Sequence, residues 1–194
     1  MANTAKYDRE QVVDKAMLLF WEKGFHGTST RDLQRTINLR PGSFYAAFGS
    51  KEQLFKEALN RYSQQGRDLL QLNVAKSKSI LGAIEGFIKA LVLDQRDQVP
   101  SDMCMLVKTI AELTDEQPEL VNESKVLLQS MEGSMVDLLA QAKLREELKP
   151  NVDCEVLAKK VIVQMMGLRT YLRSSNNEKL VEMLILEIFD SSRS

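Results

Sequence analysis

The sequence is poor in the residues that disulfide frameworks, metal sites and catalytic triads need. Its 194 residues include two cysteines, Cys104 and Cys154, and one histidine, His26. Two cysteines are too few for a disulfide framework, which fits a reducing cytosol. The chain contains no P-loop and no G-x-G-x-x-G motif, and no acid–base pair has a recognisable motif spacing. We therefore expect a protein that is not an enzyme, with no catalytic residues, no metal and no cofactor.

Proline and long apolar runs are also scarce. The chain has four prolines, and no stretch of Val, Ile or Thr alternates with polar residues as in a strand. No segment reaches the roughly 18 uninterrupted apolar residues that indicate a membrane span, and the N-terminus MANTAKYDRE lacks the apolar region of a secretion signal. With 44% hydrophobic and 27% charged residues, the composition is that of an ordinary globular protein. We expect an all-α, cytoplasmic protein.

Apolar residues recur at helical spacing along the chain, and capping residues mark the breaks between them. Pro41 suits the first position of a helix, and Gly24 and Gly49 suit helix ends. The pattern predicts about nine helices, over 8–24, 30–37, 41–48, 51–74, 79–95, 103–113, 118–147, 153–173 and 178–190.

Charge is distributed unevenly between the two ends of the chain. Residues 1–66 hold 10 Lys/Arg and 7 Asp/Glu, a net charge of +3, whereas residues 67–194 hold 16 and 20, a net charge of −4. Between residues 25 and 51 the only acid is Asp32, against Arg31, Arg35, Arg40 and Lys51. This asymmetry favours a polyanionic partner at the N-terminal end.

The helices predicted at 30–37 and 41–48 are joined by a short turn, which is typical of a helix-turn-helix unit. In such a unit the second helix enters the major groove, and its N-terminal residues reach base edges. Phe44 and Phe48 would face inward. The residues predicted to face DNA are Arg40, Pro41, Gly42, Ser43 and Tyr45, with Lys51 on a phosphate at the start of the next helix. Spacing alone leaves open a helical hairpin that binds nothing.

The stretches GFHGTS at 24–29 and GSFYAAFGSKEQL at 42–54 make the pattern more specific. With these motifs, residues 9–58 resemble the N-terminal domain of the TetR family of bacterial transcription regulators. The resemblance implies DNA contacts at Thr28 and Thr30 as well, and phosphate contacts from Lys6 and Arg9. It also implies a homodimer on a palindromic operator, most often as a repressor. The alternative function is a helical adaptor that binds only protein.

The expected organisation is a DNA-binding domain over 1–50 and a ligand-binding and dimerisation domain over 51–194, with the helix at 51–74 as connector. The resemblance implies that the last two helices pair across a two-fold axis. Their apolar residues form a candidate interhelical seam, although a core within one chain would have the same spacing. The predicted interface residues are Leu157, Val161, Met165, Leu168, Leu172, Leu180, Leu184 and Ile188.

Two kinds of inducing signal remain open. Cys104 begins a predicted helix, where the helix dipole and Lys108 would favour a reactive thiolate, although most lone cysteines are inert. It is a candidate sensor of thiol-reactive or oxidising compounds. Alternatively, a small molecule would bind in an apolar pocket, for which the candidate lining residues are Met103, Met131, Met135, Met165, Met166, Gly133 and Gly167. Methionines at such spacing also commonly form core.

Overall fold

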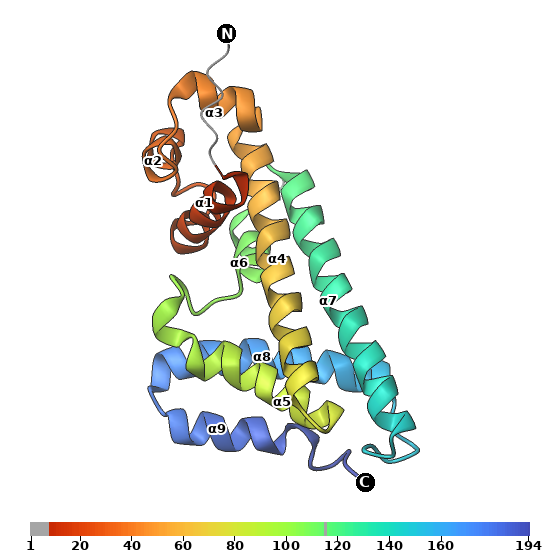
Figure 1. Ribbon diagram of the computed structural model, residues 1–194. Coiled ribbons are helices and arrows are strands. Elements are labelled where there is room, and N and C mark those ends of the chain that lie inside the picture. The colour runs from red at the N-terminus through yellow and green to blue at the C-terminus, as the bar shows by residue number, and fades with distance from the viewer. Residues whose placement is uncertain (1–7, 115) are drawn as a thin grey trace. The chain divides into compact units, whose positions relative to one another are not determined.

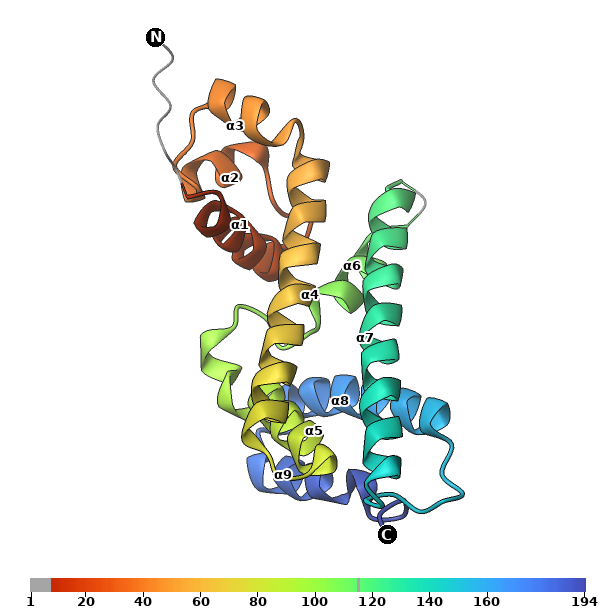
Figure 2. The same cartoon turned by 45° about the vertical axis from the view of Figure 1, so that its right-hand side comes forward.

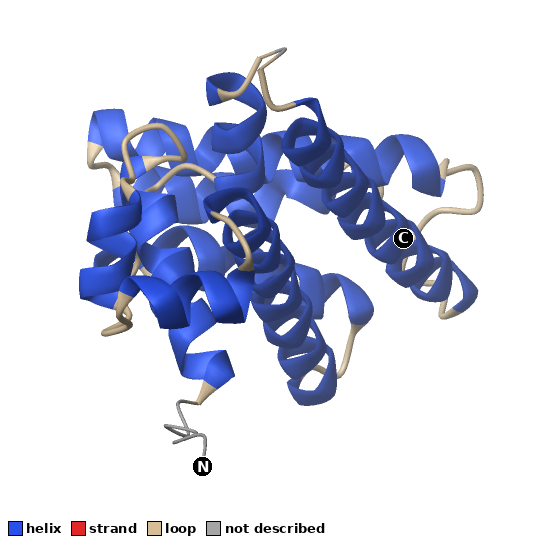
Figure 3. Ribbon diagram, turned by 90° about the horizontal axis from the view of Figure 1, so that it is seen from above, coloured by secondary structure: helices blue, strands red, loops and turns tan. Residues whose placement is uncertain are grey.

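A computed structural model describes residues 8–114 and 116–194 as helices joined by loops (Figure 1, Figure 3). The chain forms two compact units, and each is assembled from separate stretches of sequence. Unit 1 comprises Met1–Ser63 and Met105–Lys125, and unit 2 comprises Gln64–Cys104 and Val126–Ser194. The predicted boundary at residue 50 lies inside unit 1, because the first part of α4, up to Ser63, belongs to this unit; a later segment, Met105–Lys125, belongs to it as well.

Unit 1 contains the helix-turn-helix and the helices that support it. Its elements are α1 (Arg9–Lys23), α2 (Thr30–Thr36), α3 (Pro41–Phe48), the first part of α4 (Lys51–Lys76), α6 (Met105–Glu112) and the start of α7 (Pro118–Leu144). Asp8 caps α1 by accepting hydrogen bonds from the amides of Glu10 and Gln11. Ser29 and Asp32 form a reciprocal capping box at the start of α2.

The core of unit 1 is aromatic. Phe20 and Phe25 each meet Phe55 edge-to-face, with ring centroids 4.7 Å and 5.1 Å apart. Phe44 and Phe48 of α3 are buried in the same unit, with ring centroids 6.0 Å apart. Edge-to-face aromatic pairs add to the stability that burial provides, so these rings tie α1 and the loop after it to α4.

Unit 2 is built around an aliphatic core. Its elements are α5 (Ile80–Lys89), α8 (Cys154–Ser175), α9 (Glu178–Leu186) and the remaining parts of α4 and α7. In Figure 2, α5, α8 and α9 lie close together, and α9 packs against both α5 and α8. The predicted helix at 79–95 is regular only to Lys89, after which a π-helical turn spans Ala90–Asp94.

Of the helices in the described part of the chain, none combines the length and apolar character needed to cross a membrane.

Candidate nucleic-acid interface

The N-terminal half of α3 presents a solvent-exposed face. Arg40, Pro41, Gly42 and Ser43 are all exposed, and Tyr45 is 53% exposed. A Cβ atom added to Gly42 would have no neighbouring atom within 4 Å, so the backbone here is open to an approaching ligand. These five residues are the ones predicted to face DNA, and the structure brings them together on one surface, which we call the α3 face.

Buried neighbours fix the orientation of the α3 face. Phe44 and Phe48 are 0% and 3% exposed, which confirms that they point inward. The turn before α3 places Asn38 at φ 55°, a left-handed conformation that asparagine tolerates well, and Gly49 ends α3 at φ 73°. Because both ends of α3 are set by such local features, the helix can be short and still well placed.

The start of α3 has free backbone donors. Arg40 occupies the N-cap position without a side-chain capping hydrogen bond, and Pro41 is at the first helical position, where its missing N–H has no cost. The next amides, at Gly42 and Ser43, belong to the first turn, which has no intrahelical acceptors. Such amides and the positive end of the helix dipole attract phosphate.

The charge around the α3 face is positive. No acid lies between Asp32 and Glu52 in the sequence. Asp32 itself is engaged, because it accepts hydrogen bonds from the hydroxyl and amide of Ser29 and pairs with Arg35 at 2.9 Å. The hydrogen bonds from Ser29 lower the pKa of Asp32, and the nearby Lys23 and Arg35 lower it further. The exposed Arg31 and Arg40 therefore dominate the local field.

Two residues predicted to contact DNA have internal roles. Thr28 is 0% exposed, and its hydroxyl donates to the carbonyl of Gly24 at 2.6 Å, so its side chain holds the α1–α2 loop instead of facing solvent. Lys51 is half-buried, with its ammonium 4.1 Å from the centroid of the Phe25 ring. Burial lowers the pKa of Lys51, against the opposing effects of Glu52 and Glu112. Thr30 is half-buried at the start of α2, and its DNA contact stays a prediction.

Arg9 has a structural role in place of the predicted phosphate contact. Its guanidinium pairs with Glu57 at 2.7 Å, donates to the carbonyl of Ala47 at 3.1 Å and stacks 4.7 Å from the centroid of the Phe48 ring. It therefore ties α1 to the end of α3 and to α4. Lys6, the other predicted arm contact, lies outside the described residues.

Comparison with known proteins decides the family. The sequence of residues 12–58 matches the family model described as bacterial regulatory proteins, tetR family. Residues 80–185 match the family model described as tetracyclin repressor-like, C-terminal domain. The chain belongs to the TetR family. TetR-family proteins are DNA-binding transcriptional regulators, which confirms the predictions of a regulator and of a protein that is not an enzyme.

Named relatives agree along most of the chain. The HTH-type transcriptional repressor ComR of Escherichia coli K12 is 27% identical over 179 residues, which cover 91% of this chain and 85% of ComR. A TetR-family regulator from Cytophaga hutchinsonii shares the fold with a TM-score of 0.85 at 21% identity, covering 99% of this chain and 98% of that one. A cysteine mutant of the TetR-family regulator CifR, solved with operator DNA, superposes with a TM-score of 0.83 at 24% identity, covering 96% and 97%.

The residues of the predicted thiol sensor in this TetR-family protein lie directly before and within α6, and the sensor itself stays a prediction. Cys104 is half-buried and directly precedes α6, which begins at Met105. Ser101 accepts a hydrogen bond from the amide of Met103, within the turn before the helix. Lys108 directs its ammonium to the carbonyls of Trp21 and Glu22, at 2.9 Å and 2.8 Å, so it is engaged with the end of α1.

The residues predicted to line a ligand pocket are divided between the core and the surface of unit 2. Met135 and Met165 are part of the core of unit 2, with Met131 and Met166 packed against it. Met103, Gly133 and Gly167 are exposed, and the two glycines have open space around them. Because both glycines are at the surface, the prediction that they leave space for a ligand inside the protein is wrong.

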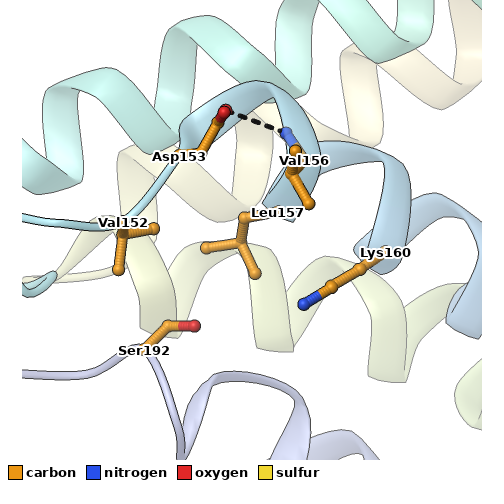
Figure 4. Close-up of a pocket in the computed structure, with 6 residues that line it drawn as sticks. All are labelled: Val152, Asp153, Val156, Leu157, Lys160 and Ser192. Carbon is orange, nitrogen blue, oxygen red and sulfur yellow. Dashed lines mark hydrogen bonds between the residues drawn. The ribbon is translucent and has the colours of Figure 1, made fainter.

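Unit 2 does contain a surface cavity elsewhere. It has a volume of about 240 Å³, and the side chain of Lys160 on α8 points toward the space between Leu157 and Ser192 (Figure 4). This is smaller than typical ligand pockets of roughly 300–1,000 Å³. None of the predicted pocket residues lines it; its lining is Val152, Asp153, Val156, Leu157, Lys160 and Ser192.

The predicted dimer seam is the inner face of the last helices. Its α8 residues are buried in the core of the same chain, as is Ile188, whereas Leu180 and Leu184 are half-buried. A buried side chain already has its partners within the subunit, so the apolar spacing comes from a core within one chain. The prediction of a dimer interface is therefore wrong for Leu157, Val161, Met165, Leu168, Leu172 and Ile188.

Proposed function

We propose that this TetR-family regulator is a homodimeric, cytoplasmic repressor that binds a palindromic operator through the α3 face of each subunit. The observation that carries the proposal is that face itself: exposed, free of acids, with small residues and free backbone amides at the start of a helix. Arg40 can read guanine or clamp a phosphate, and Tyr45 and Ser43 can donate to phosphates or bases. The name of ComR as a repressor and the CifR–operator complex support this reading.

A second exposed surface supports the dimer. Val156, Val163, Gly167 and Tyr171 follow one another on α8 at spacings of seven, four and four, so they share one side of the helix. Val163 is 67% exposed, and on α9 Met183 and Leu186 are 47% and 58% exposed. Exposed apolar side chains at helical spacing indicate a protein partner, and a glycine among them lets a second helix approach closely. We call this surface the α8 face and propose that it pairs with a second copy.

Repression and release then have a simple physical basis. Two heads joined by one interface must match successive major grooves, about 34 Å or a multiple apart. A signal that changes the position of the heads weakens both half-sites together. To change the occupancy of the operator from nearly full to nearly empty, the signal must bind the DNA-incompetent state more tightly than the DNA-binding state by roughly 5.5 kcal/mol. The signal is a small molecule or a thiol-reactive, oxidising compound.

The thiol branch of this proposal rests on Cys104. Its side chain is half-buried, so a small reagent has partial access, and it directly precedes a helix of the DNA-binding unit. A thiol-reactive compound should release the wild-type protein from DNA but leave Cys104→Ser bound. Cys154→Ser is the matched control, because Cys154 is also half-buried but begins α8, next to Asp153 and Glu155. Equal release of wild type and Cys104→Ser would leave only the reversible small molecule.

The proposed function is tested with the wild-type protein and the DNA upstream of its own gene. A labelled duplex of that sequence should be retarded at protein concentrations at which a scrambled duplex of the same length is not. Sedimentation should show twice the 22.0 kDa mass of one chain. Absence of sequence-dependent retardation would contradict the repressor, and a species of one-chain mass at micromolar concentration would contradict the dimer.

A further inference from the structure

Two charged residues of α6 bind the backbone of the segment that enters the helix-turn-helix. Lys108 and Glu112 are four residues apart and therefore lie on the same side of α6, next to the end of α1 (Figure 1). The ammonium of Lys108 donates to the carbonyls of Trp21 and Glu22, at 2.9 Å and 2.8 Å. The carboxylate of Glu112 accepts from the amides of Phe25 and His26, at 3.1 Å and 2.7 Å. We call this arrangement the α6 clasp.

Each charge of the α6 clasp matches the backbone groups that it meets. The last carbonyls of α1 have no intrahelical donors and carry the negative end of the helix dipole, so a cation satisfies both needs. The amides of Phe25 and His26 follow the helix end, and a carboxylate accepts from both at once. The α6 clasp thus replaces the solvent at the end of α1 with four charge-assisted hydrogen bonds.

The arrangement is unfavourable for α6 itself. Glu112 is the last residue of the helix, where the dipole disfavours a negative charge. A lysine four residues before a glutamate is also the weaker order for an ion pair within a helix. Since the stability of α6 gains little from these residues, their contribution lies in the contact with α1 and the loop.

The backbone at Gly24 is shaped to the α6 clasp. Gly24 has φ 79°, a conformation that favours glycine, and a Cβ atom there would lie 2.3 Å from a carboxylate oxygen of Glu112. The carbonyl of Gly24 also accepts from the buried hydroxyl of Thr28. The carboxylate and the loop therefore approach each other as closely as a residue without a side chain permits.

The clasped loop connects to the elements that come before and after α3 in the chain. It leads through Ser29, the cap of α2, into the helix-turn-helix. The ring of Phe25 lies under the ammonium of Lys51, the first residue after α3 and its turn, and against Phe55 of α4. A change in the position of Phe25 therefore changes the support of the elements before and after α3.

We propose that Lys108 and Glu112 are positioning residues for DNA binding, which hold the α1–α2 loop in the conformation that the α3 face requires. This inference rests on the proposed function for its effect on DNA, but its effect on the loop is measurable without DNA. The clasp makes a segment more than a hundred positions into the chain part of the DNA-binding unit, in agreement with the composition of unit 1.

The first test compares amide hydrogen exchange in the full-length wild type and Glu112→Gln, in which the charge and one acceptor oxygen are lost. Exchange at Phe25, His26 and the α3 amides should accelerate roughly tenfold, a typical size for coupling between sites. The amides of α9 should be unaffected. Glu119→Gln, an exposed glutamate of α7 in the same unit, is the matched control. Unchanged exchange in α3, or an equal increase throughout the protein, would overturn the proposal.

The second test asks whether the clasp supports sequence-specific binding by the α3 face. It uses the duplex from the protein's own upstream DNA and a scrambled duplex of the same length. The wild type should discriminate between them, and Lys108→Met and Glu112→Gln should lose roughly tenfold of that discrimination. Lys108→Arg, which keeps the charge and the donors, should restore it, and the exposed Lys125→Met should resemble wild type. General destabilisation would weaken binding to both duplexes equally and would contradict the proposal.

Wild-type protein offers a check that needs no variant. If a closed clasp favours DNA binding, the bound duplex must in turn stabilise the clasp, and protection of the Phe25 and His26 amides must increase. Unchanged protection in the bound state would count against the proposal. If the wild type retards no duplex, the repressor proposal fails, whereas the exchange of Glu112→Gln without DNA still decides whether the clasp orders α3.

Discussion

The α3 face and the α8 face are both exposed sides of helices, but they differ in chemistry. The α3 face is small and polar, with a serine, a tyrosine hydroxyl, a glycine and an arginine beside uncapped amides. The α8 face carries valines and a tyrosine, with methionine and leucine on α9. Backbone donors and cations suit a polyanion, whereas aliphatic side chains suit another protein surface. The difference indicates that one molecule binds two classes of partner, and each face can be disabled separately.

The largest expected effect separates DNA binding from folding. Gly42→Asp places a carboxylate on the α3 face, where phosphates are to bind, and like-charge juxtaposition costs several kcal/mol. Operator affinity should fall about 100-fold or more, as measured by fluorescence anisotropy. The melting temperature should be equal or slightly higher, because an aspartate in the first turn of a helix is favourable and open space surrounds Gly42. Unchanged affinity would exclude the α3 face as the DNA-binding surface.

A smaller effect is expected from a charge on the α8 face. Val163→Arg places two like charges at a two-fold interface and should raise the dimer dissociation constant roughly 10- to 100-fold, as measured by sedimentation. Operator affinity should fall with it, because single heads bind independently. Val126→Arg is the matched control, since Val126 is a 50% exposed valine on α7. Equal dissociation of both variants, or of neither, would show that the dimer does not use the α8 face.

The smallest effect concerns the capping box of α2, which supports the turn before the α3 face. The lowered pKa of Asp32 means that its carboxylate stabilises the folded state above its ordinary pKa of 3.8, and this contribution is lost as the pH falls through the lower folded value. The difference in unfolding free energy between wild type and Asp32→Asn should be constant above about pH 5 and shrink below about pH 4. Urea titrations across that range provide the measurement, and a constant difference would contradict the assignment.

Local features of the DNA-binding region could be predicted from the sequence. Pro41 and Gly49 mark the ends of α3 by the backbone conformations that they favour, and Ser29 marks the start of α2 by its capping hydrogen bond. Phe44 and Phe48 are four apart and therefore lie on one side of α3. The described helices confirm the all-α fold, and the family confirms the helix-turn-helix.

Contacts between distant segments could not be predicted. Nothing near Glu112 in the sequence signals that it accepts hydrogen bonds from amides 86 and 87 positions earlier. The residue type of Thr28 and its position in the motif are those of a DNA contact, and only the fold shows that its hydroxyl donates to the carbonyl of Gly24. On α8, apolar periodicity showed which side is buried, but not whether the burial is within one chain or between two. The exposed Val156 and Val163 of α8 can be told apart from the core residues only when the buried side of the helix is known.

The most direct test of the central claim, that the α3 face of each subunit lies in a DNA groove, is a hydroxyl-radical footprint on the protein's own upstream DNA. The wild type should protect two segments whose centres lie about 34 Å or a multiple of this apart, and Gly42→Asp at the same concentration should protect neither. A single protected segment, or the same two segments protected by Gly42→Asp, would contradict it.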